Sequence, residues 1–237
     1  KKTYNNRRGV YSTFFKYAFN RGWITENPIV RVPPKQIRVS RGEATTLTAS
    51  QSQEFMSFLE SFDQGRWVTY YALCLFAGIR PGVPDGEMGR LRSKDVCLKS
   101  GIIRITAKVS KTREKRQVTI RPNLAAWLKA YPLSQYPIRR GNFQKRRARV
   151  TAKFPLTHDV MRHTYISMLV SLECSIGEAA IQAGNSEAIV RRYYLDLKTH
   201  DEAEAFFGIL PKKPAVEALD TVASVARDEF LNFQKAG

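Results

Sequence analysis

The sequence has few residues of the kinds that bind metal ions or form disulfides. Its 237 residues include three cysteines and three histidines, and they contain no CxxC pair. A structural zinc site takes four such ligands, so we expect no metal centre. Cys74, Cys97 and Cys174 are odd in number, widely spaced and set among apolar residues. This usage favours reduced core thiols in a cytosolic protein over a disulfide framework.

Long apolar runs are also missing. No stretch of about 18 apolar residues occurs, so the sequence predicts no transmembrane helix. The opening KKTYNNRRG lacks the pattern of a secretory signal and is typical of the middle of a helix. We therefore expect a chain that is truncated at its N-terminus. A hydrophobic content of 43% is normal for a globular core, and the length suits one large domain with part of another.

Acidic residues are scarce, at 21 against 39 lysines and arginines, which gives a formal net charge of +18. The imbalance is uneven. Residues 104–153 hold fifteen basic residues and one acidic residue, whereas residues 201–237 hold four basic and seven acidic residues. Solubility does not require such clustering. The clusters therefore indicate a polyanion as partner, and nucleic acid is the most common one.

The N-terminal segment predicts one helix and a linker. Apolar residues recur at helical spacing from Val10 to Ala18, which predicts a helix over residues 4–22 that ends at Gly22. Residues 27–42 are rich in proline and basic residues, which is typical of an extended linker.

A new helix is predicted after the linker. Thr48 is followed three residues later by Gln51, which is the pattern of a capped helix start. A boundary near residue 45 follows, with a first region over residues 1–45 and a second over residues 46–237.

The second region is predicted to be mostly helical with one small sheet. Residues 101–106 and 116–120 are short β-like runs around a basic tip, which predicts a hairpin with a positively charged turn. The predicted helices cover residues 67–79 (nearly all apolar, so buried), 122–131 (with Pro122 at its start), 141–150, 158–172, 175–184 (ended by Gly184), 186–195 and an amphipathic 214–234. The expected fold class is mainly α with a small antiparallel β-sheet, that is, α+β.

Cleavage of a DNA strand without a metal ion makes definite demands on side chains. The phosphodiester is anionic, so two or more fixed cations must neutralise the charge that gathers on its oxygens. A nucleophile must attack in line, and an acid must protonate the leaving 5′ oxygen. Arginine suits the first role because its planar fork matches two phosphate oxygens. Tyrosine suits the second because its ordinary pKa of about 10 makes it a passable leaving group in the reverse step.

The chain offers such residues in a definite order. Arg80 stands where the buried apolar helix ends, and Lys111 falls in the turn of the hairpin. His158 and Arg162 are four residues apart, so we expect them on one helical face. Asn185 lies nine residues before Tyr194.

These motifs resemble those of the tyrosine recombinase (phage integrase) family. Its signatures are an arginine after a buried helix, H-x-x-R-H, and G-H-S with a tyrosine nine residues past that histidine. Their counterparts here are FAGIRP, HDVMRHTYIS and GNSEAIVRRYY, with KTREKRQVTI resembling the family's lysine hairpin. The resemblance covers roughly residues 46–210 and implies a catalytic domain like those of tyrosine recombinases and type IB topoisomerases. YSTFFKYAFNRGWITENPI also resembles the last helix of the family's core-binding domain.

The resemblance implies roles for six residues. Arg80 and Arg162 would clamp the scissile phosphate, together with Asn185. Tyr194 would form a 3′-phosphotyrosyl link that stores the bond energy, so that neither ATP, a metal nor another cofactor is needed. Lys111 would be the general acid, and His158 would help to take the tyrosine proton or contact the phosphate.

Structural roles stay open for some of these residues. Arg80 is then a cation at a helix end, and His158 a structural histidine at a helix N-terminus. Lys108 and Lys115 share the hairpin turn with Lys111, so the acid is not unique.

The neighbours of the catalytic set have their own expectations. Tyr193 is expected to pack into the core, and His163 to make a supporting hydrogen bond. His200 is expected at the surface, and Arg191 and Arg192 to combine phosphate contacts with a solvated face.

Two departures from the family pattern bear on the site. Asn185 stands where the family usually has histidine or tryptophan; it can donate a hydrogen bond but cannot carry charge or a proton. With asparagine at this position, either slower cleavage or an inactive site is possible. The family also places a glutamate about three residues after the first arginine, and here the match is Glu87. This spacing indicates a short insertion at residues 82–86 beside the active site.

Double-stranded DNA is the expected partner, and no association with a membrane is expected. The expected DNA contacts are basic residues of the linker, the hairpin and two helices, namely Arg38, Arg41, Lys108, Arg113, Lys115, Arg139, Arg140, Lys145, Arg146, Arg147 and Arg191. Phosphate contacts make the affinity salt-dependent. The acidic, amphipathic C-terminal helix suits docking on a neighbouring copy, as family members do within a homotetramer, or packing on its own copy.

The leading hypothesis is a site-specific DNA recombinase, the integrase of a mobile element, in a prokaryotic cytoplasm. One alternative is a DNA-binding protein of the same fold that no longer cleaves. Another is a relaxing enzyme like the type IB topoisomerases, which acts on one strand without a tetramer.

Overall fold

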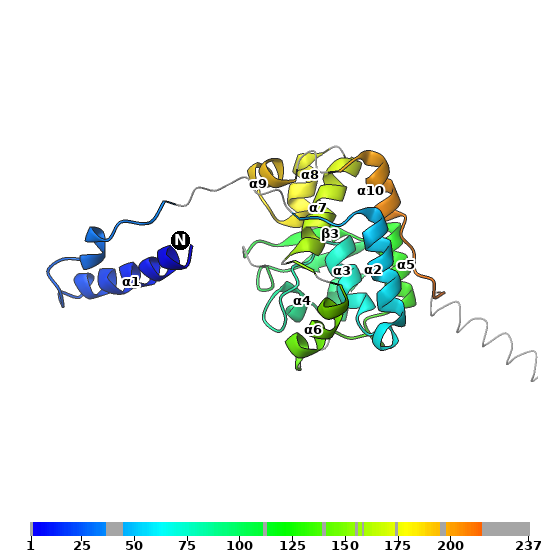
Figure 1. Ribbon diagram of the computed structural model, residues 1–237, viewed down its shortest axis with the longest axis horizontal. Coiled ribbons are helices and arrows are strands. Elements are labelled where there is room, and N and C mark those ends of the chain that lie inside the picture. Colours follow the sequence, from blue (N-terminus) through cyan, green and yellow to red (C-terminus); the bar gives the residue numbers. More distant parts are fainter. Residues whose placement is uncertain are drawn as a thin grey trace, which may run out of the picture. The chain divides into compact units, whose positions relative to one another are not determined.

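The computed structural model of the chain describes residues 2–36, 45–110, 113–138, 141–154, 156–157, 159–173, 175–194 and 198–214. Several predicted residues lie outside these ranges: Arg38, Arg41, Lys111, Arg139, Arg140, His158, Cys174 and the predicted C-terminal helix from residue 215 onward. The chain divides into two compact units, residues 1–42 and 43–237 (Figure 1).

The first unit is a helix with a chain segment folded back along it. Helix α1 spans Lys2–Asn20, and Gly22 has a φ of +70° in the turn that follows, so the predicted helix is confirmed. A short 3₁₀ helix, η1 (Pro28–Arg31), comes next. The Nη2 of Arg8 donates to the carbonyl of Ile29 at 3.3 Å. The beginning of the predicted linker is therefore packed on the helix rather than fully extended.

The second unit is mostly helical and contains one small sheet (Figure 1). Its helices are α2 (Ala49–Ser61), η2 (Phe62–Gly65), α3 (Val68–Phe76), α4 (Glu87–Arg90), η3 (Ser93–Asp95), α5 (Pro122–Ala130), α6 (Phe143–Lys153), α7 (Val160–Glu173), α8 (Ile176–Ala183), α9 (Glu187–Tyr193) and α10 (His200–Phe207). The fold is mainly α with a small antiparallel sheet, as predicted.

Helix α3 lies at the centre of this unit. All nine of its residues are buried, because the helix is apolar on every side and therefore has no face for water. It packs against α2, α5 and α7. The start of α2 is the predicted capping box, in which Thr48 and Gln51 each bond the other's backbone N–H.

The sheet has three antiparallel strands in the order β1 (Val96–Cys97), β2 (Ile102–Ile105) and β3 (Arg116–Thr119). The predicted hairpin is confirmed by the pairing of Ile103 with Val118. The two-residue β1 was not predicted, because so short a strand has no periodicity to detect. The sheet meets α8 through β3.

Helices α7 to α10 pack in succession, with α7 against α8 and α10, and α8 against α9. Helix α7 begins at Val160, and Asp159 before it has a φ of +60°. Arg162 lies in the first turn of α7. His158 lies outside the described residues, so its place on one face with Arg162 stays a prediction. Helix α8 ends at Gly184 as predicted, whereas α10 was not predicted.

Candidate active site

Arg80 reaches the site from the end of the buried helix α3. Gly78, between them, has a φ of +60°, and a Cβ there would lie 2.3 Å from the ring of Tyr165, so this turn requires glycine. The Arg80 side chain is 18% exposed. Its Nη1 donates to the Oε1 of Glu87 at 2.5 Å, and its Nη2 lies 3.3 Å from the carbonyl of Gly184.

Glu87 is the buried acid of the site. It begins α4, directly after the insertion at residues 82–86, and its side chain is 1% exposed. The N–H of Gly89, in α4, donates to the carbonyl of Gly82 at 2.9 Å, which closes the loop onto this helix. The backbone N–H of Arg80 donates to Oε2 of Glu87 at 3.2 Å.

Arg116 is the second partner of Glu87 and was not predicted as a site residue. Its two terminal nitrogens donate to the two carboxylate oxygens at 3.0 and 2.7 Å, and its Nε donates to the carbonyl of Gln182 at 3.1 Å. A signal for it exists in the sequence. Arg116 lies two residues before Val118 on strand β3, so both side chains are on the same, buried face of the strand. A charged residue on that face is the signal.

Arg162 is the most deeply held cation of the predicted set, at 4% exposed. Its Nη1 donates to the carbonyl of Gly78 at 2.5 Å, and its Nη2 donates to the carbonyl of Ala183. These bonds connect α7 with the ends of α3 and α8. The guanidinium is thus held between three helices by backbone atoms.

Asn185 joins the two predicted clamp arginines. Its Oδ1 lies 3.2 Å from Nη2 of Arg162 and 3.4 Å from Nη2 of Arg80. It follows Gly184, which ends α8 with a φ of +63°; a Cβ at Gly184 would lie 2.9 Å from Arg116. The side-chain oxygen therefore occupies a position where two guanidinium groups converge.

Tyr194 lies at the C-terminal end of α9 and is 5% exposed. Its hydroxyl is 2.7 Å from Nδ1 of His163, on α7. His163 thus has a hydrogen bond, as expected, and its partner is the predicted nucleophile. Tyr193 is only partly buried, at the edge of the core. Tyr193 packs against the core as expected, but Tyr194 is the more deeply buried of the two.

Burial and the neighbouring arginines act against each other on the pKa of Glu87 and in the same direction on the pKa of Arg162. Burial alone would raise the pKa of the Glu87 carboxyl, but the hydrogen bonds and charges of Arg116 and Arg80 lower it to about 2. Burial lowers the pKa of Arg162 to about 10, helped by the charges of Arg80 and Arg116. Arg162 stays charged at neutral pH. Three arginines and one carboxylate leave an excess of positive charge that suits an anionic ligand.

Burial also raises the pKa of the Tyr194 phenol above its ordinary value. The charges of Arg162 and Arg80 act in the opposite direction, while those of Asp159 and Tyr193 add to the increase. The phenol is therefore protonated at neutral pH.

A cavity of 710 Å³ opens beside this cluster. Its lining includes Arg80, Lys115, Asn185 and exposed isoleucines of α8 and α9. Arg80 and Asn185 of the cluster therefore face a cavity with a basic and apolar lining. Within the residues that the structure describes, no group of three His, Cys, Asp or Glu side chains is placed to hold a metal ion.

The other predicted DNA contacts have several environments. Lys108, Arg113, Lys115, Lys145 and Arg191 are exposed, and Arg146 is partly buried. Arg147 instead faces inward and lines a small cavity with Tyr70 and Tyr71. His200 is exposed at the start of α10, as expected.

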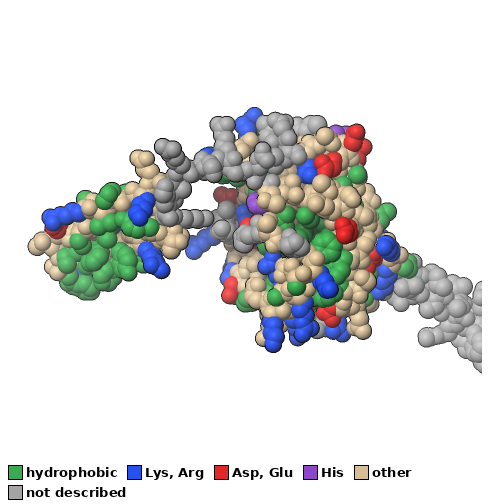
Figure 2. All heavy atoms as spheres, viewed as in Figure 1, with side chains coloured by type: hydrophobic (Ala, Val, Ile, Leu, Met, Phe, Trp, Pro, Cys, Tyr) green, Lys and Arg blue, Asp and Glu red, His purple; other side chains and the backbone are tan. Residues whose placement is uncertain are grey.

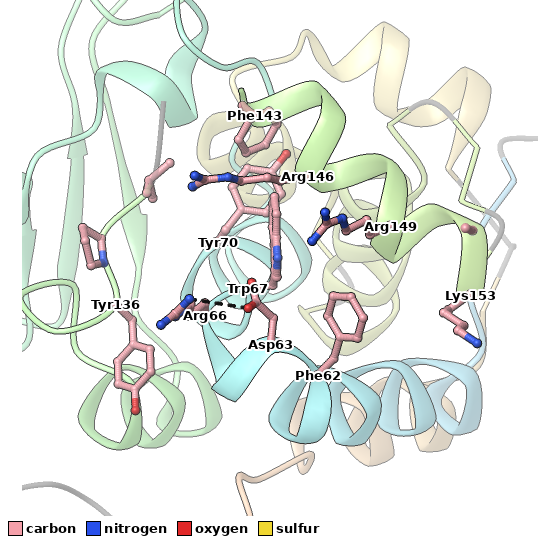
Figure 3. Close-up of a pocket in the computed structure, with 13 residues that line it drawn as sticks. Phe62, Asp63, Arg66, Trp67, Tyr70, Tyr136, Phe143, Arg146, Arg149 and Lys153 are labelled. Carbon is pink, nitrogen blue, oxygen red and sulfur yellow. Dashed lines mark ion pairs between the residues drawn. The ribbon is translucent and has the colours of Figure 1, made fainter. Parts of the chain in front are cut away.

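A second cavity, of 690 Å³, lies between α6 and the η2–α3 segment (Figure 3). Its aromatic wall is formed by Phe143 of α6, which packs on Trp67 and Tyr70 with ring centroids 5.5 and 5.1 Å apart. Arg146 and Arg149 extend along the opening (Figure 3). Figure 2 shows Lys and Arg side chains gathered at the same end of this unit, over α6. This end is the basic face of the unit.

No helix in the part of the chain that the structure describes is long and apolar enough to cross a membrane. Comparison of the sequence with protein-family models and with curated proteins gave no match.

The fold has clear counterparts among solved structures. The Tn1549 transposon integrase in complex with circular intermediate DNA is 17% identical, with a TM-score of 0.56 over 86% of this chain and 78% of that one. A lambda integrase dimer bound to a COC′ core site is 18% identical, with a TM-score of 0.60 over 81% of this chain and 73% of that one. The chain has the fold of a tyrosine recombinase catalytic domain.

Proposed function

We propose that the chain cuts and rejoins DNA strands as a site-specific recombinase, with Tyr194 as the nucleophile. The observation that supports this most is the convergence of Arg80 and Arg162 on one oxygen, Oδ1 of Asn185, in the same cluster as the buried Tyr194. A phosphate oxygen is the kind of ligand that two such guanidinium groups bind.

In this proposal the cations act before the bond breaks. Arg80 and Arg162 bind the non-bridging oxygens of the scissile phosphate and stabilise the charge that develops there. Glu87 and Arg116 do not touch the DNA; they hold Arg80 in position. Asn185 turns its amide so that the NH₂ group donates to the phosphate.

The covalent step follows. The Tyr194 oxygen attacks phosphorus, the bond from phosphorus to the 5′ oxygen breaks, and the leaving oxygen takes a proton from Lys111. A 5′ hydroxyl of a partner strand then attacks the 3′-phosphotyrosyl link and releases the tyrosine. The energy of the original bond is kept in that link, so the reaction uses neither metal nor ATP. The role of Lys111 rests on the resemblance.

DNA binding rests on charge and on the structural neighbours. Both neighbours described above are complexes with DNA. In this chain the basic face of α6 and the hairpin would contact phosphates, and α6 would approach the major groove. Residues 1–45 would add contacts as the end of a core-binding domain.

The proposal includes a biological role and an oligomeric state. The enzyme would serve the integration or excision of a mobile element in a prokaryotic cytoplasm. It would act as a homotetramer on DNA, in which residues 214–234 dock on a neighbouring copy.

One observation favours a second candidate, a DNA-binding protein that does not cleave. Asn185 offers an oxygen, not a charged donor, to Arg80 and Arg162, and this contact competes with a phosphate. A relaxing enzyme like the type IB topoisomerases would use the same chemistry on one strand.

A covalent-trapping experiment tests the proposal. The full chain is incubated with labelled duplexes from the DNA that flanks its gene, each nicked at successive positions so that a released fragment cannot rejoin. Duplexes that the protein shifts in a gel are quenched with SDS and examined for a protein–DNA adduct. Tyr194→Phe and Tyr193→Phe are treated in the same way.

The proposal expects an adduct from the native chain and from Tyr193→Phe, and none from Tyr194→Phe. Loss of the adduct with Tyr193→Phe alone would show that Tyr193, not Tyr194, is the nucleophile. A duplex that is bound by every version without any adduct would establish the non-cleaving alternative, and Asn185→His would then be the variant to test for gain of cleavage.

A further inference from the structure

The contact between His163 and Tyr194 connects two helices at the reacting atom. His163 belongs to α7 and directly follows Arg162, whereas Tyr194 ends α9. Nδ1 of the imidazole lies 2.7 Å from the phenol oxygen, and the ring centroids are 5.5 Å apart with planes inclined by 34°. This is a hydrogen bond of ordinary length, and it holds the oxygen that the proposed reaction uses.

The phenol needs such a partner because of its surroundings. Tyr194 is buried, and burial raises its pKa. A neutral phenol is a poor nucleophile, so its proton must be transferred as the new bond to phosphorus forms. A base within hydrogen-bond reach of the oxygen is the usual solution.

The charged groups around the phenol are of two kinds. Arg162 and Arg80 lower the pKa of Tyr194, but guanidinium groups are donors only and cannot take its proton. Asp159, at the start of α7, and Tyr193, on α9, oppose ionisation of Tyr194. His163 differs from the arginines, because an imidazole nitrogen can accept a proton and return it near neutral pH.

We propose that His163 is the catalytic base, which accepts the Tyr194 proton at Nδ1 during attack and returns it when the phosphotyrosyl link is broken. This inference rests on the proposed function. It requires the neutral tautomer in which Nε2 carries the hydrogen, so that the lone pair of Nδ1 accepts the hydrogen bond from the phenol. The resemblance assigns the tyrosine proton to His158; the hydrogen bond assigns it to His163.

The step balances. The O–H bond of Tyr194 breaks and an N–H bond forms on His163, the new bond joins the tyrosine oxygen to phosphorus, and the bond to the 5′ oxygen breaks. That oxygen takes its proton from the general acid. In the second step, the acid takes the proton of the attacking 5′ hydroxyl, and His163 returns its own to the tyrosine.

The test is the rate of adduct formation on a nicked duplex under single-turnover conditions, from pH 5.5 to 9.5. The variants are His163→Gln, which keeps a hydrogen-bonding side chain but has no base, and His163→Ala. Asp159→Asn is the matched control, since it removes a nearby charge and leaves the imidazole of His163 in place. Gel-shift affinity and the melting temperature are measured for each variant.

The native rate should increase with pH and then level off near neutrality. For His163→Gln we expect a loss of about 100-fold or more at pH 7, as is typical for a missing general base. Its rate should continue to increase up to the highest pH, because the phenol must then ionise without help. Added imidazole should restore part of the rate of His163→Ala, and Asp159→Asn should keep the native profile shape.

A second substrate separates a base from an acid. When sulfur replaces the bridging 5′ oxygen, the leaving group departs as a thiolate and needs no proton. A variant without its general acid then recovers, whereas His163→Gln should remain slow. Native rates and an unchanged pH profile in His163→Gln overturn the inference, and so does full recovery on the sulfur substrate.

Failure of the inference can be told apart from failure of the proposed function. An adduct from the native chain that Tyr194→Phe abolishes and His163→Gln leaves unchanged overturns the base alone. A bound duplex that gives no adduct with the native chain overturns the proposed function, and the inference with it.

Discussion

The chain holds its basic residues in two opposite environments. In the candidate active site, Arg116 and Arg162 are buried, and backbone carbonyls or Glu87 fix their guanidinium groups. On α6, Lys145 and Arg149 are exposed to solvent. The first arrangement supplies geometry, since a buried guanidinium with several bonds cannot move far. The second supplies charge, which salt screens readily. The same residue types therefore should respond very differently to substitution.

The largest difference is expected for Arg162→Ala against Arg149→Ala. The first change leaves the carbonyls of Gly78 and Ala183 without their donor, which should cost about 3 kcal/mol of folding free energy and abolish adduct formation. The second, on the exposed face of α6, should change stability by less than about 0.5 kcal/mol. Urea unfolding and the trapping assay measure the two effects. Equal losses of stability would break the distinction.

Glu87→Gln should remove a pH dependence from the stability. The pKa of Glu87 is lowered to about 2 in the folded chain, below its unfolded value. Its ionised form therefore stabilises the fold above the unfolded pKa, and this stabilisation is lost as the pH falls through the folded one. We expect a loss of about 3 kcal/mol between pH 5 and pH 2 in the native chain, and a smaller loss in the variant.

The control for this experiment is Asp63→Asn. Asp63 pairs with Arg66 at 3.6 Å, but both side chains are more than 40% exposed, and such a pair contributes less than about 1 kcal/mol. Unfolding followed from pH 7 to pH 2 compares the three proteins. A Glu87→Gln curve parallel to the native one would show that this buried carboxylate does not set the acid sensitivity.

Asn185→Asp should separate stability from activity. A carboxylate at this position lies within reach of Arg80 and Arg162, so it should increase the melting temperature. It should also compete with the phosphate and slow adduct formation by about 10-fold, the equivalent of about 1.4 kcal/mol. Thermal unfolding and single-turnover trapping provide the two readouts. Faster trapping in this variant would contradict the clamp.

The smallest effects are expected on the basic face. Lys145→Gln should weaken DNA binding by a few-fold, reduce the salt dependence by about one charge and leave the folding stability unchanged. Lys129→Gln, an exposed change on α5, is the comparison. Gel-shift titrations at several salt concentrations measure both. Identical salt slopes for the two variants would exclude α6 from the DNA contacts.

Local signals in the sequence predicted most of the elements. Thr48 with Gln51, Pro122 and Gly184 act through neighbouring backbone atoms, so their effect is readable within one turn of chain. The errors lie where local pattern was not enough. Asp159 has a φ of +60° and precedes α7, although the helix was predicted to include it. Strand β1 has two residues and is too short to show a period, whereas α10 is as long as the predicted α8 and was missed.

For the candidate site too, one part could be predicted from the sequence and another part depends on tertiary packing. The sequence by itself determined the basic character of the chain, the order of its motifs and the identity of Arg80, Arg162, Asn185 and Tyr194, because composition and spacing are properties of the chain. Only the tertiary structure decided that Arg116 shares Glu87 with Arg80 and that His163, not a neighbour in sequence, bonds Tyr194. These contacts join residues 29 and 31 positions apart. Packing creates such proximity, and no local periodicity encodes it.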